Sequence, residues 1–153
     1  MDYLLLKLIH ILSATILFGT GIGSAFYLFM ANRRKDIASI YFATQHVVIA
    51  DWVFTTPSII VQLITGVALA HQLGLPMTEG WVLWSLLLYF FAGACWLPVV
   101  WMQIRMRDMA RQACEQHTPL PARYWRYDRW WIMLGSLAFP AVVVIIGLMV
   151  MKP

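Results

Sequence analysis

Charged residues are scarce in this chain, at 12% of 153 residues, while hydrophobic residues make up 61%. An average soluble domain carries about 25% charged residues, so this composition excludes an ordinary soluble protein. Cysteine is also rare, with Cys95 in an apolar run and Cys114 in a polar segment. Their spacing supports neither a disulfide framework nor a zinc site. The composition therefore predicts an integral membrane protein.

Acidic residues are fewer than basic ones, seven against eleven, which gives a net charge of +4. A basic chain can bind nucleic acid, but here the basic residues cluster between apolar runs and do not follow one soluble face. We interpret them as signals of membrane topology. We expect no nucleic-acid partner.

Long apolar runs dominate the remaining sequence, and the first of them, from Leu4 to Met30, ends in a basic turn. About 20 apolar residues in a helix cross a hydrocarbon core about 30 Å thick. We predict four such spans in one transmembrane domain over 1–153, at about 4–30, 48–70, 82–103 and 130–151. Short connections favour an all-α, up-down four-helix bundle in contact with the lipid bilayer.

The polar segments beside these spans predict further local structure. Residues 36–51 read as a helix that runs into the second span, and Pro57 should kink that span. The third span should continue as a polar helix until Pro119. Residues 122–129 read as a turn before the last span.

Basic residues are distributed unevenly between the connections. Nine of the eleven lie in the first and third connections, at Arg33, Arg34, Lys35, Arg105, Arg107, Arg111, Arg123, Arg126 and Arg129. The second connection has no lysine or arginine. By the positive-inside rule, we predict a multi-pass protein of a bacterial inner membrane with a periplasmic N-terminus and a periplasmic C-terminus.

The first span contains two features that plain lipid does not explain. Lys7 and His10 are three residues apart and share one helix face, where each needs a partner, a cavity or a cofactor. Gly19 and Gly23 form a pair of small residues that would let another helix or a flat ligand approach closely. Such a pair also makes a homo-oligomer possible.

His71 should lie at the outer end of the second span, at a depth near that of His10. Two histidines on neighbouring antiparallel helices can hold a haem iron from both sides, so His10 and His71 are candidate ligands. The alternative is that His10 is a hydrogen-bonded core histidine and His71 an ordinary interface residue.

Asp51 and His46 lie at the inner end of the second span, too far from His71 to share its site. We expect Asp51 to pair with a cation at the same membrane face, either Arg33, Arg34, Arg105 or Arg107. A proton relay through Asp51, Gln103 and nearby hydroxyl groups is the alternative.

Several motifs carry a resemblance to known families: LKLIHIL (6–12), LFGTGIGSAFY (17–27), ADWVFTTP (50–57), LITG (63–66), GACWLP (93–98) and LMVMKP (148–153). Together they resemble a bacterial family of small predicted integral membrane proteins of unknown function. The match covers nearly the whole chain.

A more distant resemblance is to the HemJ-type protoporphyrinogen oxidases and, in the first helix, to CopD-type membrane proteins. It is carried by Lys7 with His10, by Phe26-Tyr27, by Thr56-Pro57 with Gly66, and by Gly80-Trp81. The HemJ-type resemblance implies haem b held by His10. The chain departs from that pattern after Trp81, where no lysine follows and Ser85 is the nearest polar residue.

Two functions follow as hypotheses. The first is a haem b-binding bundle that exchanges electrons with a quinone or porphyrin, with Lys7 placed to meet a carboxylate. The second is a cofactor-free membrane partner or small-solute permease component, assembled through Gly19 and Gly23.

Overall fold

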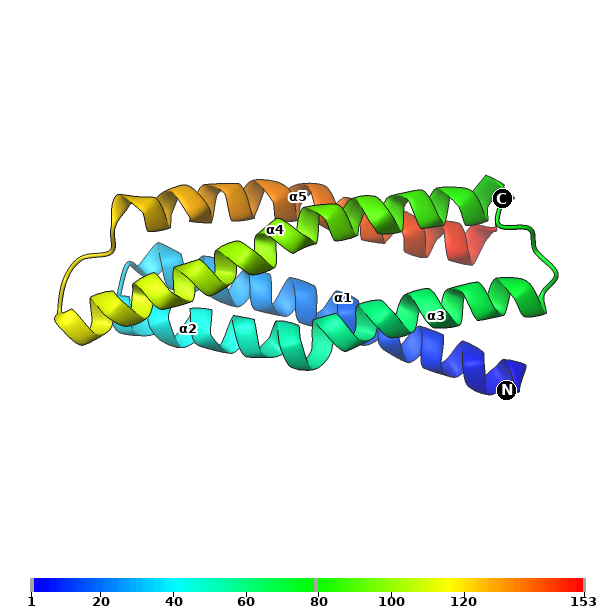
Figure 1. Cartoon of the computed structure of the whole chain (residues 1–153), viewed down its shortest axis with the longest axis horizontal. Helices are drawn as coiled ribbons and strands as arrows, with labels where there is room; N and C mark the ends of the chain where they lie inside the picture. Colours follow the sequence, from blue (N-terminus) through cyan, green and yellow to red (C-terminus); the bar gives the residue numbers. More distant parts are fainter. Residues whose placement is uncertain (1, 79, 153) are drawn as a thin grey trace.

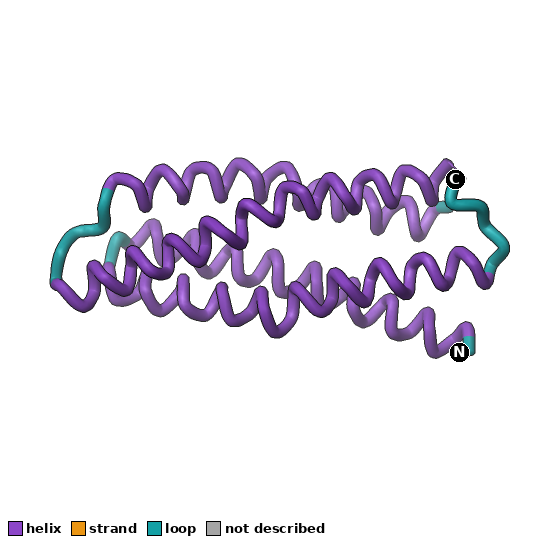
Figure 2. Tube along the Cα trace, viewed as in Figure 1, coloured by secondary structure: helices purple, strands orange, loops and turns teal. Residues whose placement is uncertain are grey.

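The computed structural model describes residues 2–78 and 80–152, and every regular element in this part of the chain is helical (Figures 1 and 2). In chain order the elements are α1 (Tyr3–Arg34), α2 (Ile37–Ala50), the π-helical η1 (Asp51–Thr55), α3 (Thr56–Gln72), α4 (Gly80–Gln116) and α5 (Ala122–Met151). Because α2, η1 and α3 follow one another without a break, they form one long bent helix. The fold is therefore an up-down bundle of four long helices, as the sequence predicts.

All four long helices are long and apolar enough to cross a membrane. Their outward side chains are large and hydrophobic, for example Leu4, Phe26, Ile64, Leu97 and Val150, which are all more than half exposed. Lipid can cover such side chains, and helices satisfy their own backbone hydrogen bonds within it. The chain is a multi-pass membrane protein in contact with the bilayer.

The second long helix bends at the π-helical segment η1, directly before Pro57. There the backbone N–H of Thr56 donates to the carbonyl of Asp51, five residues back, and the Thr56 hydroxyl donates to the same oxygen at 2.8 Å. Proline has no N–H and its ring crowds the preceding turn, so a wider turn relieves that clash. The predicted kink is present, with its centre in the turn that precedes Pro57.

Two predictions at the polar segments have different outcomes. The polar continuation of α4 to Gln116 is confirmed. The predicted turn over residues 122–129 is wrong, because α5 already begins at Ala122, directly after Pro121. The reason is Tyr124, which is fully buried among the other helices and makes this stretch part of the core.

Both ends of the chain lie at the same end of the bundle as the connection that follows α3 (Figure 1). We call this the outer end, and we call the opposite end, with the α1–α2 and α4–α5 connections, the inner end. The basic connections belong to the inner end. That the inner end faces the cytoplasm stays a prediction.

A shared apolar core holds the helices together towards the inner end. Its fully buried members come from α1, α2, α4 and α5: Leu28, Ile40, Met106, Ala110 and Tyr124. Small residues such as Ala31 and Ala43 let the helices approach closely around them. In this half of the bundle, side chains of the four helices fill the interior.

A series of buried hydrogen bonds through Asn32 links α5 to α1 at the same end. The Tyr124 hydroxyl donates to Oδ1 of Asn32 at 2.6 Å, and Nδ2 of Asn32 donates to the Asp128 carboxylate at 2.7 Å. Both ends of the Asn32 amide are therefore satisfied, which a buried amide requires.

We expect Tyr124→Phe to lower the free energy of unfolding by about 1–3 kcal/mol, because it leaves the buried Asn32 carbonyl oxygen unpaired. Tyr127→Phe is the matched control, since among the described residues the Tyr127 hydroxyl accepts a hydrogen bond from the exposed Arg123 alone. Its change should stay within about 0.5 kcal/mol. Unfolding in mixed detergent micelles measures the free energy of unfolding of both variants. Equal losses of free energy would show that the hydrogen bonds of Asn32 do not stabilise the inner end.

Candidate functional site

A large cavity occupies the middle and outer parts of the bundle. There α1 packs mainly on α3 and α4 mainly on α5, and the space between these two pairs measures about 1770 Å³. Most ligand pockets measure about 300–1,000 Å³, so this one could hold a large molecule. Its walls are mostly apolar, with aromatic rings from α1, α4 and α5 that include Phe18, Trp96 and Phe139.

His10 stands at the wall of this cavity, towards the outer end. Its Nδ1 lies 2.7 Å from the hydroxyl oxygen of Thr65 on α3. The Thr65 hydroxyl has a single hydrogen, and its shortest contact is with the carbonyl oxygen of Val61 at 2.6 Å. We therefore assign the hydrogen between His10 and Thr65 to Nδ1, which donates to the threonine oxygen.

This assignment fixes the state of the other ring nitrogen. In a neutral imidazole with a proton on Nδ1, Nε2 carries the lone pair. Nε2 of His10 has no hydrogen-bond partner in the described part of the chain. A lone pair at the wall of a large apolar cavity can bind a metal ion or accept a proton from a ligand.

Gly66 is what allows the His10 ring to lie against α3. A Cβ at this position would stand 3.3 Å from Cε1 of His10, closer than side chains usually approach. Sequence reasoning did not give Thr65 or Gly66 a role at the site, although both stand in the LITG motif that carries part of the family resemblance. Their spacing alone does not show that they face α1.

A second polar pair follows on the same faces of α1 and α3. The buried Ser13 hydroxyl lies 3.0 Å from the carbonyl oxygen of His10 and 3.1 Å from Oε1 of Gln62, so its one hydrogen is shared between two acceptors. With the His10 contact, this pair holds α1 against α3. These contacts hold the part of α1 that carries the His10 imidazole in place at the cavity.

Lys7, one turn outward from His10, also lines the cavity, and so does Lys152 after the end of α5. The ammonium group of Lys7 lies 5.9 Å from the centre of the Tyr3 ring. Among the described residues, no other lysine and no arginine lines the cavity. They place positive charge at its outer end.

His71 does not line the cavity. It is exposed in the last turn of α3, six residues after Thr65 and five after Gly66. At about 100° per residue, that places it on the opposite side of α3. The structure therefore does not bring His71 and His10 together.

Contacts between the two helix pairs narrow the cavity midway. The rings of Phe18 and Phe139 are 5.0 Å apart, and the Tyr89 hydroxyl donates to the carbonyl of Ile59 at 2.8 Å. At about 1.5 Å per residue, both contacts lie about 10 Å further inward than His10. They separate an outer pole, formed by His10 with Thr65, from an inner pole.

The inner pole is built around Asp51, which is 5% exposed at the start of η1. With the Gln103 amide oriented to satisfy both of its ends, Nε2 donates to the Asp51 carboxyl at 2.5 Å and Oε1 accepts from the Trp131 indole at 3.1 Å. Asp51 and Thr65 are 14 residues apart. The two poles are thus about 20 Å apart along the bundle.

The expected ion pair between Asp51 and Arg33, Arg34, Arg105 or Arg107 is wrong. Among the described residues, the ion pairs are Arg107 with its neighbour Asp108 and Arg111 with Glu115. The side chain of Asp51 points into the bundle, where Gln103 meets it, and the basic side chains lie towards the inner end. The alternative prediction for Asp51 is a proton relay that includes Gln103. These two side chains are in contact, and the relay itself stays a prediction.

Thr55, also in η1, is 4% exposed and lines the cavity. Its hydroxyl makes no hydrogen bond of good geometry in the described structure, although it lies close enough to the Asp51 carboxyl to interact with it. A threonine in a helix usually donates to the carbonyl four residues back, here that of Asp51, but Thr56 already donates to that oxygen twice. In the π-helical turn, the acceptor beside the Thr55 hydroxyl is thus the Asp51 carboxyl and not a backbone carbonyl.

The glycines of the first span do not make the close helix approach that their spacing suggests. An added Cβ at Gly19 or Gly23 would meet nothing within 4 Å. Gly19 borders the cavity, and Gly23 is exposed. Among the described glycines, the close approach to another helix is at Gly66, and assembly through Gly19 and Gly23 stays a prediction.

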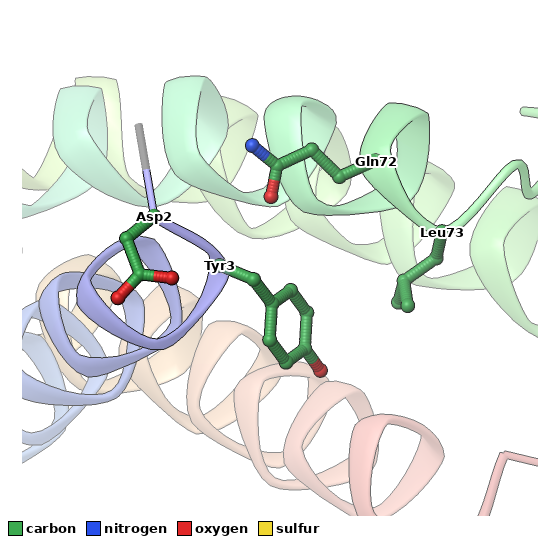
Figure 3. Close-up of a pocket in the computed structure, with 4 residues that line it drawn as sticks. All are labelled: Asp2, Tyr3, Gln72 and Leu73. Atoms are coloured by element: carbon green, nitrogen blue, oxygen red, sulfur yellow. The ribbon is translucent and has the colours of Figure 1, made fainter.

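A second, smaller pocket of about 550 Å³ lies at the outer ends of α1 and α3. Figure 3 shows the four residues that line it: Asp2 and Tyr3 at the start of α1, and Gln72 and Leu73 at the end of α3. It is shallow and open, and none of the candidate ligands lines it.

The fold and the cavity define a multi-pass helical membrane protein with a large, half-open apolar cavity and two polar poles. The family model described as "Predicted integral membrane protein (DUF2269)" matches residues 4–153, and the chain belongs to that family. No curated protein and no solved structure matches the chain.

We expect Gly93→Ala to raise the free energy of unfolding by up to about 1 kcal/mol, because alanine favours a helix and a Cβ there meets nothing. Gly66→Ala should gain less or lose stability, because its Cβ pushes the His10 ring away from Thr65. Thermal unfolding in detergent measures the pair. Equal gains at both positions would show that His10 does not pack on Gly66.

Proposed function

We propose that this protein binds haem b in the outer part of the cavity through Nε2 of His10 and serves electron transfer or porphyrin chemistry in a bacterial inner membrane. The observation that carries the proposal is the contact between His10 Nδ1 and Thr65. It orients the imidazole and leaves the lone pair of Nε2 towards a cavity. When bound, haem supplies one-electron redox chemistry.

The surroundings of His10 fit a metal ligand. Metal-binding histidines almost always donate their other ring N–H to an oxygen, which fixes the tautomer and makes the ligand nitrogen more basic. Thr65 supplies that oxygen, and Val61 takes the threonine hydrogen.

The cavity fits the remainder of the ligand. Its apolar, partly aromatic walls suit a flat macrocycle, and its volume exceeds that of most small-molecule pockets. Lys7 and Lys152 lie at the outer end, where they can meet the two carboxylates of haem b as point charges. The ligand would then lie with its polar edge towards the membrane surface.

His10 is the one histidine among the described residues that line the cavity. The expected second ligand, His71, lies on the opposite side of α3. Our proposal therefore uses a single histidine, His10, to hold the haem.

His10→Ala should abolish haem retention and leave the helical fold intact, because the cavity walls remain. His71→Ala is the control, and it should keep the wild-type Soret absorbance. Absorption spectra of the two detergent-purified variants, at equal protein concentration, make the comparison. A His10→Ala protein that retains haem would exclude His10 as the indispensable ligand and favour the cofactor-free hypothesis.

Thr65→Val should weaken haem binding about 10- to 100-fold, the usual effect of removing the partner of a ligand histidine. Valine keeps the shape of threonine but cannot accept from Nδ1. Thr15→Val is a suitable control, since the Thr15 hydroxyl donates to the carbonyl of Ile11 in its own helix. Haem titration of the apoproteins measures the difference, and equal affinity in both variants would mean that Thr65 does not support the ligand.

A further inference from the structure

The inner end of the bundle has an excess of positive charge. Over residues 33–36 and 105–129, nine lysines and arginines stand against four acidic residues. Among the described residues, the ion pairs join Arg107 to Asp108 and Arg111 to Glu115. Seven of the nine basic side chains there thus form no ion pair within the described chain.

Two of these seven, Arg105 and Arg123, flank a pair of aromatic rings. The guanidinium carbon of Arg105 lies 5.6 Å from the centre of the Trp101 ring, and that of Arg123 lies 5.2 Å from the centre of the Tyr127 ring. The centres of the two rings are 5.6 Å apart across α4 and α5. We call these four side chains the interfacial cluster.

Both arginines of the interfacial cluster stand at the same depth. The helices α4 and α5 are antiparallel neighbours, and α4 runs towards the inner end (Figure 1). Arg105 follows Trp101 by four residues, and Arg123 precedes Tyr127 by four residues. Each arginine is therefore about one helical turn closer to the inner end than its ring.

The interfacial cluster continues a face of α4 that meets lipid. Leu97, Trp101 and Arg105 are each four residues apart, so they share one side of the helix. Leu97 is 65% exposed and Trp101 is 49% exposed, as lipid-facing apolar side chains are. Tryptophan and tyrosine gather at membrane interfaces, so the ring pair marks that level. The two guanidinium groups, one turn further inward, then lie among the lipid headgroups.

Hydrogen-bond donors outnumber acceptors in the interfacial cluster. Nε of Arg123 donates to the Tyr127 hydroxyl at 2.9 Å, which leaves the hydrogen of that hydroxyl free to donate. Among the described residues, neither this hydrogen nor any N–H of the Arg105 guanidinium has an acceptor. A phosphate group supplies oxygens for several such donors, and a guanidinium matches it with two parallel hydrogen bonds.

We propose that the interfacial cluster binds the phosphate of an anionic phospholipid, whose acyl chains lie along the lipid-facing side of α4. Arg105, Arg123 and the Tyr127 hydroxyl donate to the phosphate oxygens. Basic clusters next to membrane spans attract anionic lipids, which accords with this assignment. The depth of Trp101 favours a lipid over a soluble acidic protein, since a lipid is already present at that level. The site lies at the opposite end of the bundle from His10 and does not depend on a ligand there.

The test is titration of the detergent-purified chain with dioleoyl-phosphatidylglycerol, followed by native mass spectrometry of the lipid-bound protein. Arg105→Gln/Arg123→Gln should weaken the binding of the first lipid about 10- to 30-fold, because each basic residue near a membrane surface adds to the attraction. The matched control is Arg107→Gln/Arg111→Gln, which removes the same charge from arginines that already pair with carboxylates. It should bind within about threefold of the wild type. Equal weakening in both double variants would overturn the proposal, because net charge alone would then account for the binding.

Tyr127→Phe tests the cluster without a loss of charge. It keeps the ring against Trp101 and removes only the hydroxyl, so it should weaken phosphatidylglycerol binding about fivefold, the effect of one lost hydrogen bond. This variant is expected to fold as the wild type does, so it also decides the matter if the arginine double variant does not fold. Wild-type affinity in Tyr127→Phe would overturn the proposal.

Three other probes identify the ligand class. Dioleoyl-phosphatidylcholine has the same chains and phosphate but no net charge, so it should bind the wild type more weakly than phosphatidylglycerol. Equal affinity for the two lipids would overturn the proposal. Inorganic phosphate and hexaglutamate peptide should not displace phosphatidylglycerol, because neither has acyl chains. Displacement by the phosphate or by the peptide would show that the cluster binds a soluble anion or an acidic protein, and would also overturn it.

Discussion

Unequal packing along the bundle is the constraint on which the rest of the structure depends. Towards the inner end, fully buried side chains such as Ile40, Met106 and Tyr124 join the helices into one core. Towards the outer end the helices separate into two pairs, and a cavity of about 1770 Å³ lies between them. Because the inner core fixes the helix directions, the outer half can remain hollow without loss of the fold.

The hydrogen bonds at each pole follow from the free-energy cost of burying an unsatisfied polar group in a membrane. An imidazole or a carboxyl within the membrane needs partners, and here neighbouring helices provide some of them but not all. Thr65 satisfies one nitrogen of His10, and Gln103 satisfies one oxygen of Asp51. Nε2 of His10 remains unsatisfied among the described residues, and His10 lines a cavity large enough for a ligand.

The sequence predicts the spans well, because long apolar runs and clustered arginines are strong signals in membrane proteins. It also marks His10 as a residue that needs a partner. It cannot show which face of α3 meets α1, and so it misses Thr65 and Gly66 and pairs His10 with His71. The two histidines lie on one end of the bundle but on different sides of α3. Likewise, the sequence predicts an ion pair between Asp51 and an arginine, whereas the side chain of Asp51 points into the bundle and contacts Gln103.

The central claim is that His10 presents Nε2 to a bound haem. The most direct measurement is the absorption spectrum of the wild-type protein, purified in mild detergent from haem-replete cells and supplemented with haem b. Our account predicts a Soret band at about one haem per chain, with the spectrum of an iron held by one histidine. A protein that stays colourless after haem addition would contradict it.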